Sequence, residues 1–80
     1  MPALRHVLTL QEYGRIRLDL KGLMDSRGIS RNALARSIDV RFEVVNKWYN
    51  GEVFKADLDI LARICFVLEC EPGDILKWEK

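Results

Sequence analysis

Apolar residues recur at helical spacing in four parts of this chain. They predict helices at about residues 20–27, 31–37, 42–49 and 58–68. Asp19, Ser30 and Asp57 each stand just before such a segment, where a side-chain oxygen can accept a hydrogen bond from a free backbone N–H. Gly28 and Gly51 stand just after one, where the backbone turns left-handed. We therefore expect four helices joined by short connections.

The two ends of the chain follow other patterns. Residues 1–14 show no clean period, and we expect an arm there. The run RIRLDL at 15–20 alternates apolar and polar residues, which leaves open a short strand at 15–18. From Pro72 onward, the segment PGDIL predicts a last short turn that returns its apolar residues to the core.

These elements predict an all-α fold, a compact bundle of four to five helices with an arm at 1–14 and one domain at 15–80. The residues of the fourth helix that we expect to face inward are Leu58, Leu61, Ala62, Cys65 and Leu68. This helix carries more apolar surface than one core face can bury, so we expect a homodimer. The candidate interface is Ile60, Ile64, Phe66 and Val67. Pairing of the 15–20 runs of two copies is a second route.

Composition narrows the function classes. Eighty residues, 49% of them hydrophobic and 31% charged, suit a single globular domain. No apolar run approaches the roughly 18 residues of a membrane span, so we expect a cytoplasmic protein. The chain has one histidine and no glycine-rich phosphate loop, so we expect that it is not an enzyme and holds no cofactor. Cys65 and Cys70 are too few for a zinc site, and their spacing on a helix predicts different faces; we expect both to be reduced and Cys65 to fill the core.

Charge is distributed unevenly along the chain, although its formal net value is only +1. Residues 1–55 hold ten Lys and Arg against six Asp and Glu, which gives +4. Residues 56–80 hold three against six, which gives −3. A basic part joined to an acidic part indicates that one face meets a polyanion, although chance clustering on a solvated surface explains the same numbers.

The third predicted helix has one polar face with an aromatic edge. At 100° per residue, its exposed positions fall within about 140° of one another. They are Phe42, Glu43, Asn46, Lys47 and Asn50. Its apolar residues Val44, Val45 and Trp48 lie on the other side. A helix held from behind with hydrogen-bonding groups in front suits the reading of base edges in a major groove.

The segment SRNALARSIDVRFEVVNKWYNG resembles the helix-turn-helix of Cro/cI-type regulators. The flanking stretches IRLDLKGLMDSRG and LDILARICFVLECEPGDIL resemble the first helix and the last two helices of a compact bacterial branch of that family. Only residues 1–14 lie outside the resemblance. It implies a lambda-repressor-like bundle, double-stranded DNA as the partner and a role as a transcriptional regulator, most simply a repressor.

The resemblance also implies roles for particular residues. Ala35 is the small residue where the two motif helices touch, Val40 fills the turn, and Val45 and Trp48 seat the recognition helix. The base-reading positions fall on Phe42, Glu43, Asn46 and Lys47. The phosphate-binding positions fall on Arg31, Asn50 and Lys55, and Arg41 stands where the family has a small polar cap and can reach a phosphate instead.

Other readings of these residues stay open. Asp39 replaces the usual glycine of the turn, which remains feasible because aspartate tolerates the left-handed conformation. Glu43 and Lys47 stand four residues apart and can form a surface ion pair instead of reading bases. Phe42 can contact a thymine methyl group or pack on its own helix. A protein-interaction module or antitoxin-like partner with the same fold is the alternative to DNA binding, because the overall charge is modest.

Overall fold

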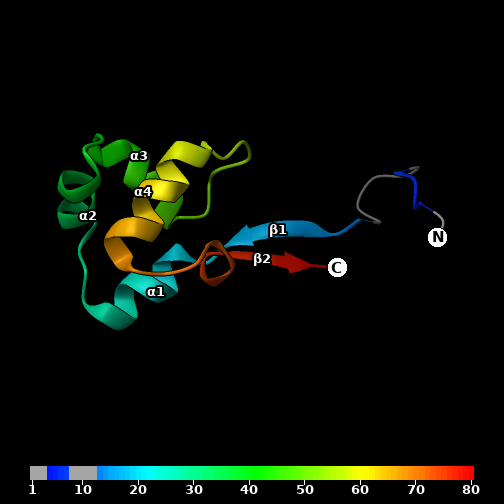
Figure 1. Ribbon diagram of the computed structural model, residues 1–80, viewed down its shortest axis with the longest axis horizontal. Helices are drawn as coiled ribbons and strands as arrows, with labels where there is room; N and C mark the ends of the chain where they lie inside the picture. The colour runs from blue at the N-terminus through cyan, green and yellow to red at the C-terminus, as the bar shows by residue number, and fades with distance from the viewer. Residues whose placement is uncertain (1–3, 8–12) are drawn as a thin grey trace.

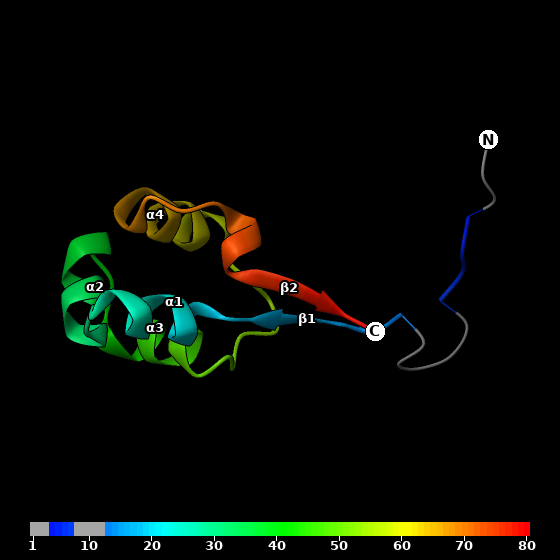
Figure 2. The same ribbon diagram turned by 90° about the horizontal axis from the view of Figure 1, so that it is seen from below.

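Four helices form one end of the molecule, and two strands extend from it side by side (Figure 1, Figure 2). The computed structural model describes residues 4–7 and 13–80. Its elements are β1 Arg15–Leu18, α1 Leu20–Arg27, α2 Arg31–Ile38, α3 Phe42–Tyr49, α4 Leu58–Leu68, the short 3-10 helix η1 Pro72–Asp74 and β2 Leu76–Glu79. The four predicted helices are confirmed, and no helix among the described residues could cross a membrane.

Two of the three predicted helix caps are confirmed. The Ser30 hydroxyl accepts a hydrogen bond from the backbone N–H of Ala33 at 3.1 Å. The Asp57 carboxylate accepts from the N–H groups of Asp59 at 2.8 Å and Ile60 at 3.4 Å. Asp19 precedes α1 as expected, but its side chain makes no capping bond. Its backbone N–H instead donates to the carbonyl of Ile75 at 2.7 Å, which ties the start of α1 to the C-terminal segment.

Replacing Asp57 with alanine should therefore destabilise the domain by about 0.5–2 kcal/mol, because the first N–H groups of α4 lose their acceptor. Urea unfolding followed by circular dichroism measures this loss. Asp57→Asn is the matched control, since asparagine keeps the accepting oxygen and caps about as well. Equal losses in the two variants would mean that the charge of Asp57 matters and its capping bond does not.

The core is built from one apolar side of every helix. Its buried residues are Leu20, Met24, Leu34, Ala35, Ile38, Val45, Trp48, Leu61, Ile64, Leu68 and Ile75. The stripe predicted for α4 is partly wrong, because Leu58 is 75% exposed and Ala62 is exposed, while Ile64 is fully buried. Two apolar stripes overlap on this helix, and packing selects the one centred on Leu61, Ile64 and Leu68. Ile64 is thus a core residue and is removed from the candidate dimer interface.

The all-α prediction missed a two-stranded antiparallel sheet. The strand at 15–18 is confirmed as β1, and its partner β2 lies in the segment expected to end in a turn. Ile16 pairs with Trp78 and Leu18 with Leu76, so these four residues share the apolar face of the sheet. Leu18 and Leu76 pack against the helical core, whereas Ile16 and Trp78 lie farther out and are mostly exposed.

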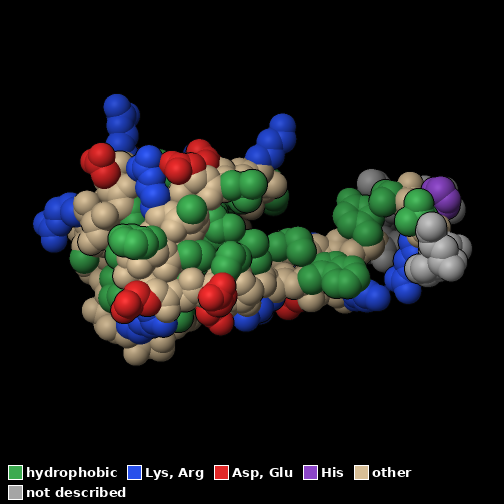
Figure 3. Space-filling model, viewed as in Figure 1, with side chains coloured by type: hydrophobic (Ala, Val, Ile, Leu, Met, Phe, Trp, Pro, Cys, Tyr) green, Lys and Arg blue, Asp and Glu red, His purple; other side chains and the backbone are tan. Residues whose placement is uncertain are grey.

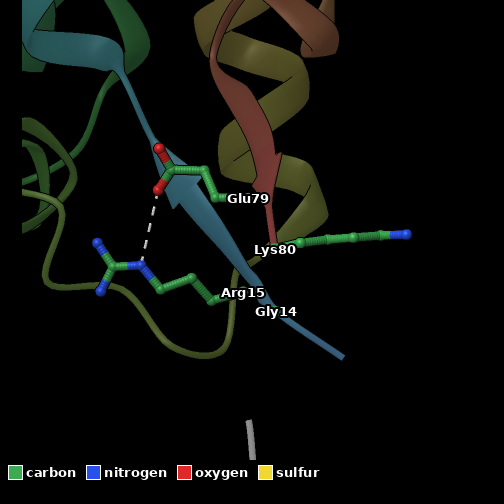
Figure 4. Close-up of a pocket in the computed structure, with 4 residues that line it drawn as sticks. All are labelled: Gly14, Arg15, Glu79 and Lys80. Carbon is green, nitrogen blue, oxygen red and sulfur yellow. Dashed lines mark ion pairs between the residues drawn. The ribbon is translucent and has the colours of Figure 1, made fainter. Parts of the chain in front are cut away.

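The opposite face of the sheet is charged. Glu79 forms ion pairs with Arg15 at 3.7 Å and Arg17 at 3.1 Å. Gly14, Arg15, Glu79 and Lys80 line a hollow of about 620 Å³ at the tip of the sheet (Figure 4). Gly14 has φ +75°, and a Cβ there would stand 2.2 Å from the carbonyl oxygen of Glu79. Glycine is therefore required where the chain enters the sheet.

The predicted arm falls partly outside the described residues. Residues 4–7 have no regular secondary structure, and Leu4 and Val7 are exposed. Residues 1–3 and 8–12 of the arm lie outside the described residues.

The prediction that the two cysteines lie on different faces of one helix is wrong, because Cys70 lies beyond the end of α4. α4 ends with Glu69 in the left-handed region at φ 50°, so the 100° rule no longer applies at Cys70. The backbone N–H of Cys70 donates to the carbonyl of Cys65 at 3.1 Å, and both thiols are free and half-buried. Burial, followed by the neighbouring Cys65, raises the pKa of the Cys70 thiol to about 11.

Candidate nucleic-acid interface

A tight corner joins α2 to α3. Asp39 adopts the left-handed conformation at φ 59°, and the N–H of Val40 donates to the carbonyl of Ala35 at 3.0 Å. Ala35 is buried beside this corner, and Val40 packs against the core. Aspartate thus makes the turn where glycine is usual, as the sequence predicted. The corner fixes the direction in which α3 leaves α2.

α3 is anchored by its inner side and open on its outer side. Val45 is fully buried and Trp48 is 3% exposed, so both seat the helix as predicted. Glu43 and Lys47 are exposed, Phe42 is 39% exposed and Asn46 is half-buried. The residues predicted to read bases therefore lie together along the outer side of one helix. Among the described residues, no ion pair joins Glu43 to Lys47.

Arg31 links the start of α2 to this outer side. Its guanidinium donates to Oδ1 of Asn46 at 2.7 Å. The same group lies 4.9 Å from the centre of the Tyr49 ring and 5.5 Å from that of Phe42. Arg31 is thus stacked on two aromatic rings while it fixes the Asn46 amide. Sequence reasoning assigned Arg31 and Asn46 separately, because nothing in the local pattern connects residues fifteen positions apart.

Tyr49 and Asp25 support this arrangement, and neither was singled out from the sequence. The Tyr49 hydroxyl donates to Asp25 Oδ1 at 2.8 Å, and the Lys21 ammonium lies 2.8 Å from Asp25 Oδ2. Hydrogen bonds from Lys21 and Tyr49 lower the pKa of Asp25, and the same partnership raises the pKa of Lys21. A carboxyl group whose pKa is lowered on folding stabilises the folded state at pH values above its ordinary pKa. This stabilisation is lost as the pH falls through the pKa of the folded state. The network therefore stays intact at neutral pH.

The predicted phosphate contacts are distributed around α3. Arg31 begins α2 and Arg41 stands at the N-cap of α3, where it makes no side-chain capping bond. Asn50 follows the last residue of α3, and Lys55 lies in the loop before α4. All four residues are exposed. Hydrogen-bond donors near both ends of a helix with an exposed outer side can bind the phosphates on either side of a groove.

A comparison with known protein families identifies the family to which this chain belongs. A family model described as the Cro/C1-type HTH DNA-binding domain matches residues 19–80. The chain belongs to this family. A search of curated proteins found no match.

The solved structures that are similar to this Cro/C1-type domain include one from Bacteroides fragilis. It is titled "Crystal structure of a putative DNA-binding protein from Bacteroides fragilis". The TM-score is 0.70 at 14% sequence identity, and the match covers 79% of this chain and 100% of that one. At this identity the likeness shows a shared fold. The family match makes residues 19–80, which include α2 and α3, a helix-turn-helix DNA-binding domain.

Two acids distinguish the outer surface of this Cro/C1-type domain from a purely basic one. Asp39 and Glu43 are exposed at the corner and the first turn of α3, among the cations Arg31, Arg41 and Lys47. Glu43 also stands near the positive end of the α3 dipole, where a carboxylate is favoured. The surface can accept hydrogen bonds as well as donate them.

Proposed function

We propose that this Cro/C1-type domain is a sequence-specific transcriptional regulator, acting as a repressor in the cytoplasm, with α3 in the major groove of double-stranded DNA. The observation that carries the proposal is the amide of Asn46, which Arg31 holds on the outer side of α3. An asparagine amide can bind adenine through N6 and N7 together. Arg31 occupies one acceptor position of Oδ1, and the second position and both Nδ2 hydrogens remain for the base.

The other outer residues complete the proposed reading surface. Glu43 can accept a hydrogen bond from cytosine N4, Lys47 can donate to guanine, and Phe42 can contact a thymine methyl group. Arg31, Arg41, Asn50 and Lys55 bind phosphates and set the position of α3 along the duplex. A domain placed in this way over a promoter blocks access to it, which is the simplest route to repression.

A salt titration tests whether the surface binds DNA. Affinity for random duplex DNA should fall with a log–log slope of about −3, because Arg31, Arg41 and Lys55 neutralise about three phosphates. Fluorescence anisotropy at several salt concentrations measures the slope. Selection from a random duplex pool then identifies the preferred site, and an Arg41→Gln variant should reduce the slope by about 1.

The alternative is a protein-interaction module or antitoxin-like partner with the same fold. Asp39 and Glu43 favour it, since two exposed acids beside the reading helix weaken attraction to phosphate. An affinity for random duplex DNA that does not change with salt concentration, together with no enriched sequence after selection, would support this alternative and overturn the proposed function.

A further inference from the structure

We propose that a positioning group of three residues keeps the guanidinium of Arg31 available for DNA, by holding it on an aromatic ring and by occupying a carboxylate that would otherwise capture it. The group consists of Lys21, Asp25 and Tyr49. The inference rests on the proposed function, in which Arg31 binds a phosphate and fixes the Asn46 amide. Acidic and basic side chains are interspersed over the helical end of the molecule (Figure 3). A cation that must bind a phosphate there has carboxylates nearby that compete for it.

The Tyr49 ring is the surface on which Arg31 rests. The guanidinium lies 4.9 Å from the centre of this ring, and the face of an aromatic ring attracts a cation. The ring is half-buried, and its hydroxyl donates to Asp25 Oδ1 at 2.8 Å. A ring that is held at its hydroxyl gives Arg31 a fixed place, from which it donates to Asn46 Oδ1 at 2.7 Å.

Asp25 is a carboxylate within electrostatic reach of Arg31. Hydrogen bonds from Lys21 and Tyr49 lower its pKa most, and the positive charge of Arg31 acts in the same direction. A carboxylate can accept two parallel hydrogen bonds from a guanidinium, and such charged bonds are roughly twice as strong as bonds between neutral groups. An unoccupied Asp25 would therefore compete with Asn46 and with a DNA phosphate for Arg31.

Both oxygens of Asp25 are occupied in this structure. Oδ1 accepts from the Tyr49 hydroxyl, and Oδ2 lies 2.8 Å from the Lys21 ammonium, which stands four residues earlier on α1. The ammonium also lies 5.4 Å from the centre of the Tyr49 ring, so it neutralises the carboxylate and steadies the ring together. Among the described residues, Arg31 forms no ion pair, and its charge remains available for a phosphate.

A Lys21→Met variant tests the capture. Methionine keeps an unbranched side chain but carries no charge, so Oδ2 of Asp25 becomes free to draw Arg31 away. Affinity for the selected DNA site should fall about threefold to tenfold, which corresponds to the loss of one hydrogen bond. Fluorescence anisotropy measures the affinity, and circular dichroism checks that this change at an exposed residue leaves the domain folded.

The double variant Lys21→Met, Asp25→Asn separates capture from a direct contact of Lys21 with DNA. Asparagine keeps an oxygen that accepts from the Tyr49 hydroxyl, but it has no charge with which to capture Arg31. Affinity should therefore return close to that of the wild type. If Lys21 itself bound a phosphate, its loss would persist in the double variant.

The matched control is Lys21→Met, Asp59→Asn. Asp59 forms an ion pair of the same spacing with Arg63 on α4, at 2.9 Å. Its replacement restores the net charge as Asp25→Asn does, but it leaves the Asp25 carboxylate free to capture Arg31. This control should keep the loss of affinity, which separates capture of Arg31 from a general effect of charge.

Nuclear magnetic resonance of the protein without DNA supplies a readout that does not depend on the proposed function. The side-chain amide signals of Asn46 should shift in Lys21→Met, because Oδ1 loses its bond from Arg31, and they should return in Lys21→Met, Asp25→Asn. Signals that shift and return support the positioning group even where the salt titration overturns DNA binding, so the two failures are distinguishable. Unshifted signals would overturn the inference, and so would a loss of affinity that Asp25→Asn does not restore or that Asp59→Asn restores equally.

Discussion

Replacing Trp48 with alanine is expected to leave the domain largely unfolded at room temperature. Trp48 is 3% exposed and belongs to the buried set that seats α3. Removing a buried tryptophan side chain costs roughly 3–5 kcal/mol, and the total stability of a native protein is roughly 5–15 kcal/mol, with small domains at the lower end. Thermal unfolding followed by near-ultraviolet circular dichroism measures the loss.

Two control variants test whether the loss of stability in Trp48→Ala comes from the buried position of this ring. Trp48→Phe keeps an apolar ring in the site and should lose less stability than the alanine variant. Phe42→Ala removes an aromatic ring from the outer side of the same helix, where it is 39% exposed, and should lose less still. A Trp48→Ala variant that remains folded but loses DNA affinity would place Trp48 on the DNA side and contradict the orientation of α3.

The second large effect is expected on DNA binding. Asn46→Ala should weaken binding to the selected DNA site by about 1–3 kcal/mol and leave random-DNA binding nearly unchanged, because the proposed base contact is lost while the charge of Arg31 remains for a phosphate. Arg31→Ala should weaken both, since it removes the proposed phosphate contact and the group that fixes the Asn46 amide. Fluorescence anisotropy with specific and random duplexes measures the two affinities.

Arg31→Lys separates the two roles of Arg31. Lysine keeps the charge for a phosphate but lacks the planar group that stacks on Phe42 and Tyr49. It should reduce specific binding and preserve the salt slope. The double variant Arg31→Lys, Asn46→Ala should lose less specific affinity than the two single losses added together, because the residues act as one unit. Additive losses would contradict the coupling of Arg31 and Asn46. Equal effects of Asn46→Ala on specific and random DNA would remove the proposed base-reading role of Asn46.

Local sequence determined the helices and the orientation of α3. Apolar spacing and cap residues act over a few positions, so they fix where a helix begins, where it ends and which side is apolar. For this reason Ser30 and Asp57 are confirmed as caps, and Val45 and Trp48 as buried anchors. The resemblance of the α2–α3 segment to Cro/cI-type regulators is confirmed by the family match over residues 19–80.

Packing decided which of two apolar stripes on α4 faces inward. Leu58, Ala62 and Cys65 fit one stripe, and Ile60, Ile64 and Val67 fit its neighbour, so periodicity alone could not rank them. The bundle buries Leu61, Ile64 and Leu68, whose mean direction lies between the two.

Contacts between distant residues were decided only by the tertiary structure. β2 is four residues long and pairs with β1 some sixty residues away, so no local period could reveal it. The apolar face of the sheet, made by Ile16, Leu18, Leu76 and Trp78, exists only because that pairing brings β1 and β2 side by side. The hydrogen bond from Arg31 to Asn46 likewise forms only because the α2–α3 corner brings the two helices into contact. Sequence by itself determined the polar side of α3, and long-range packing determined how its side chains are held.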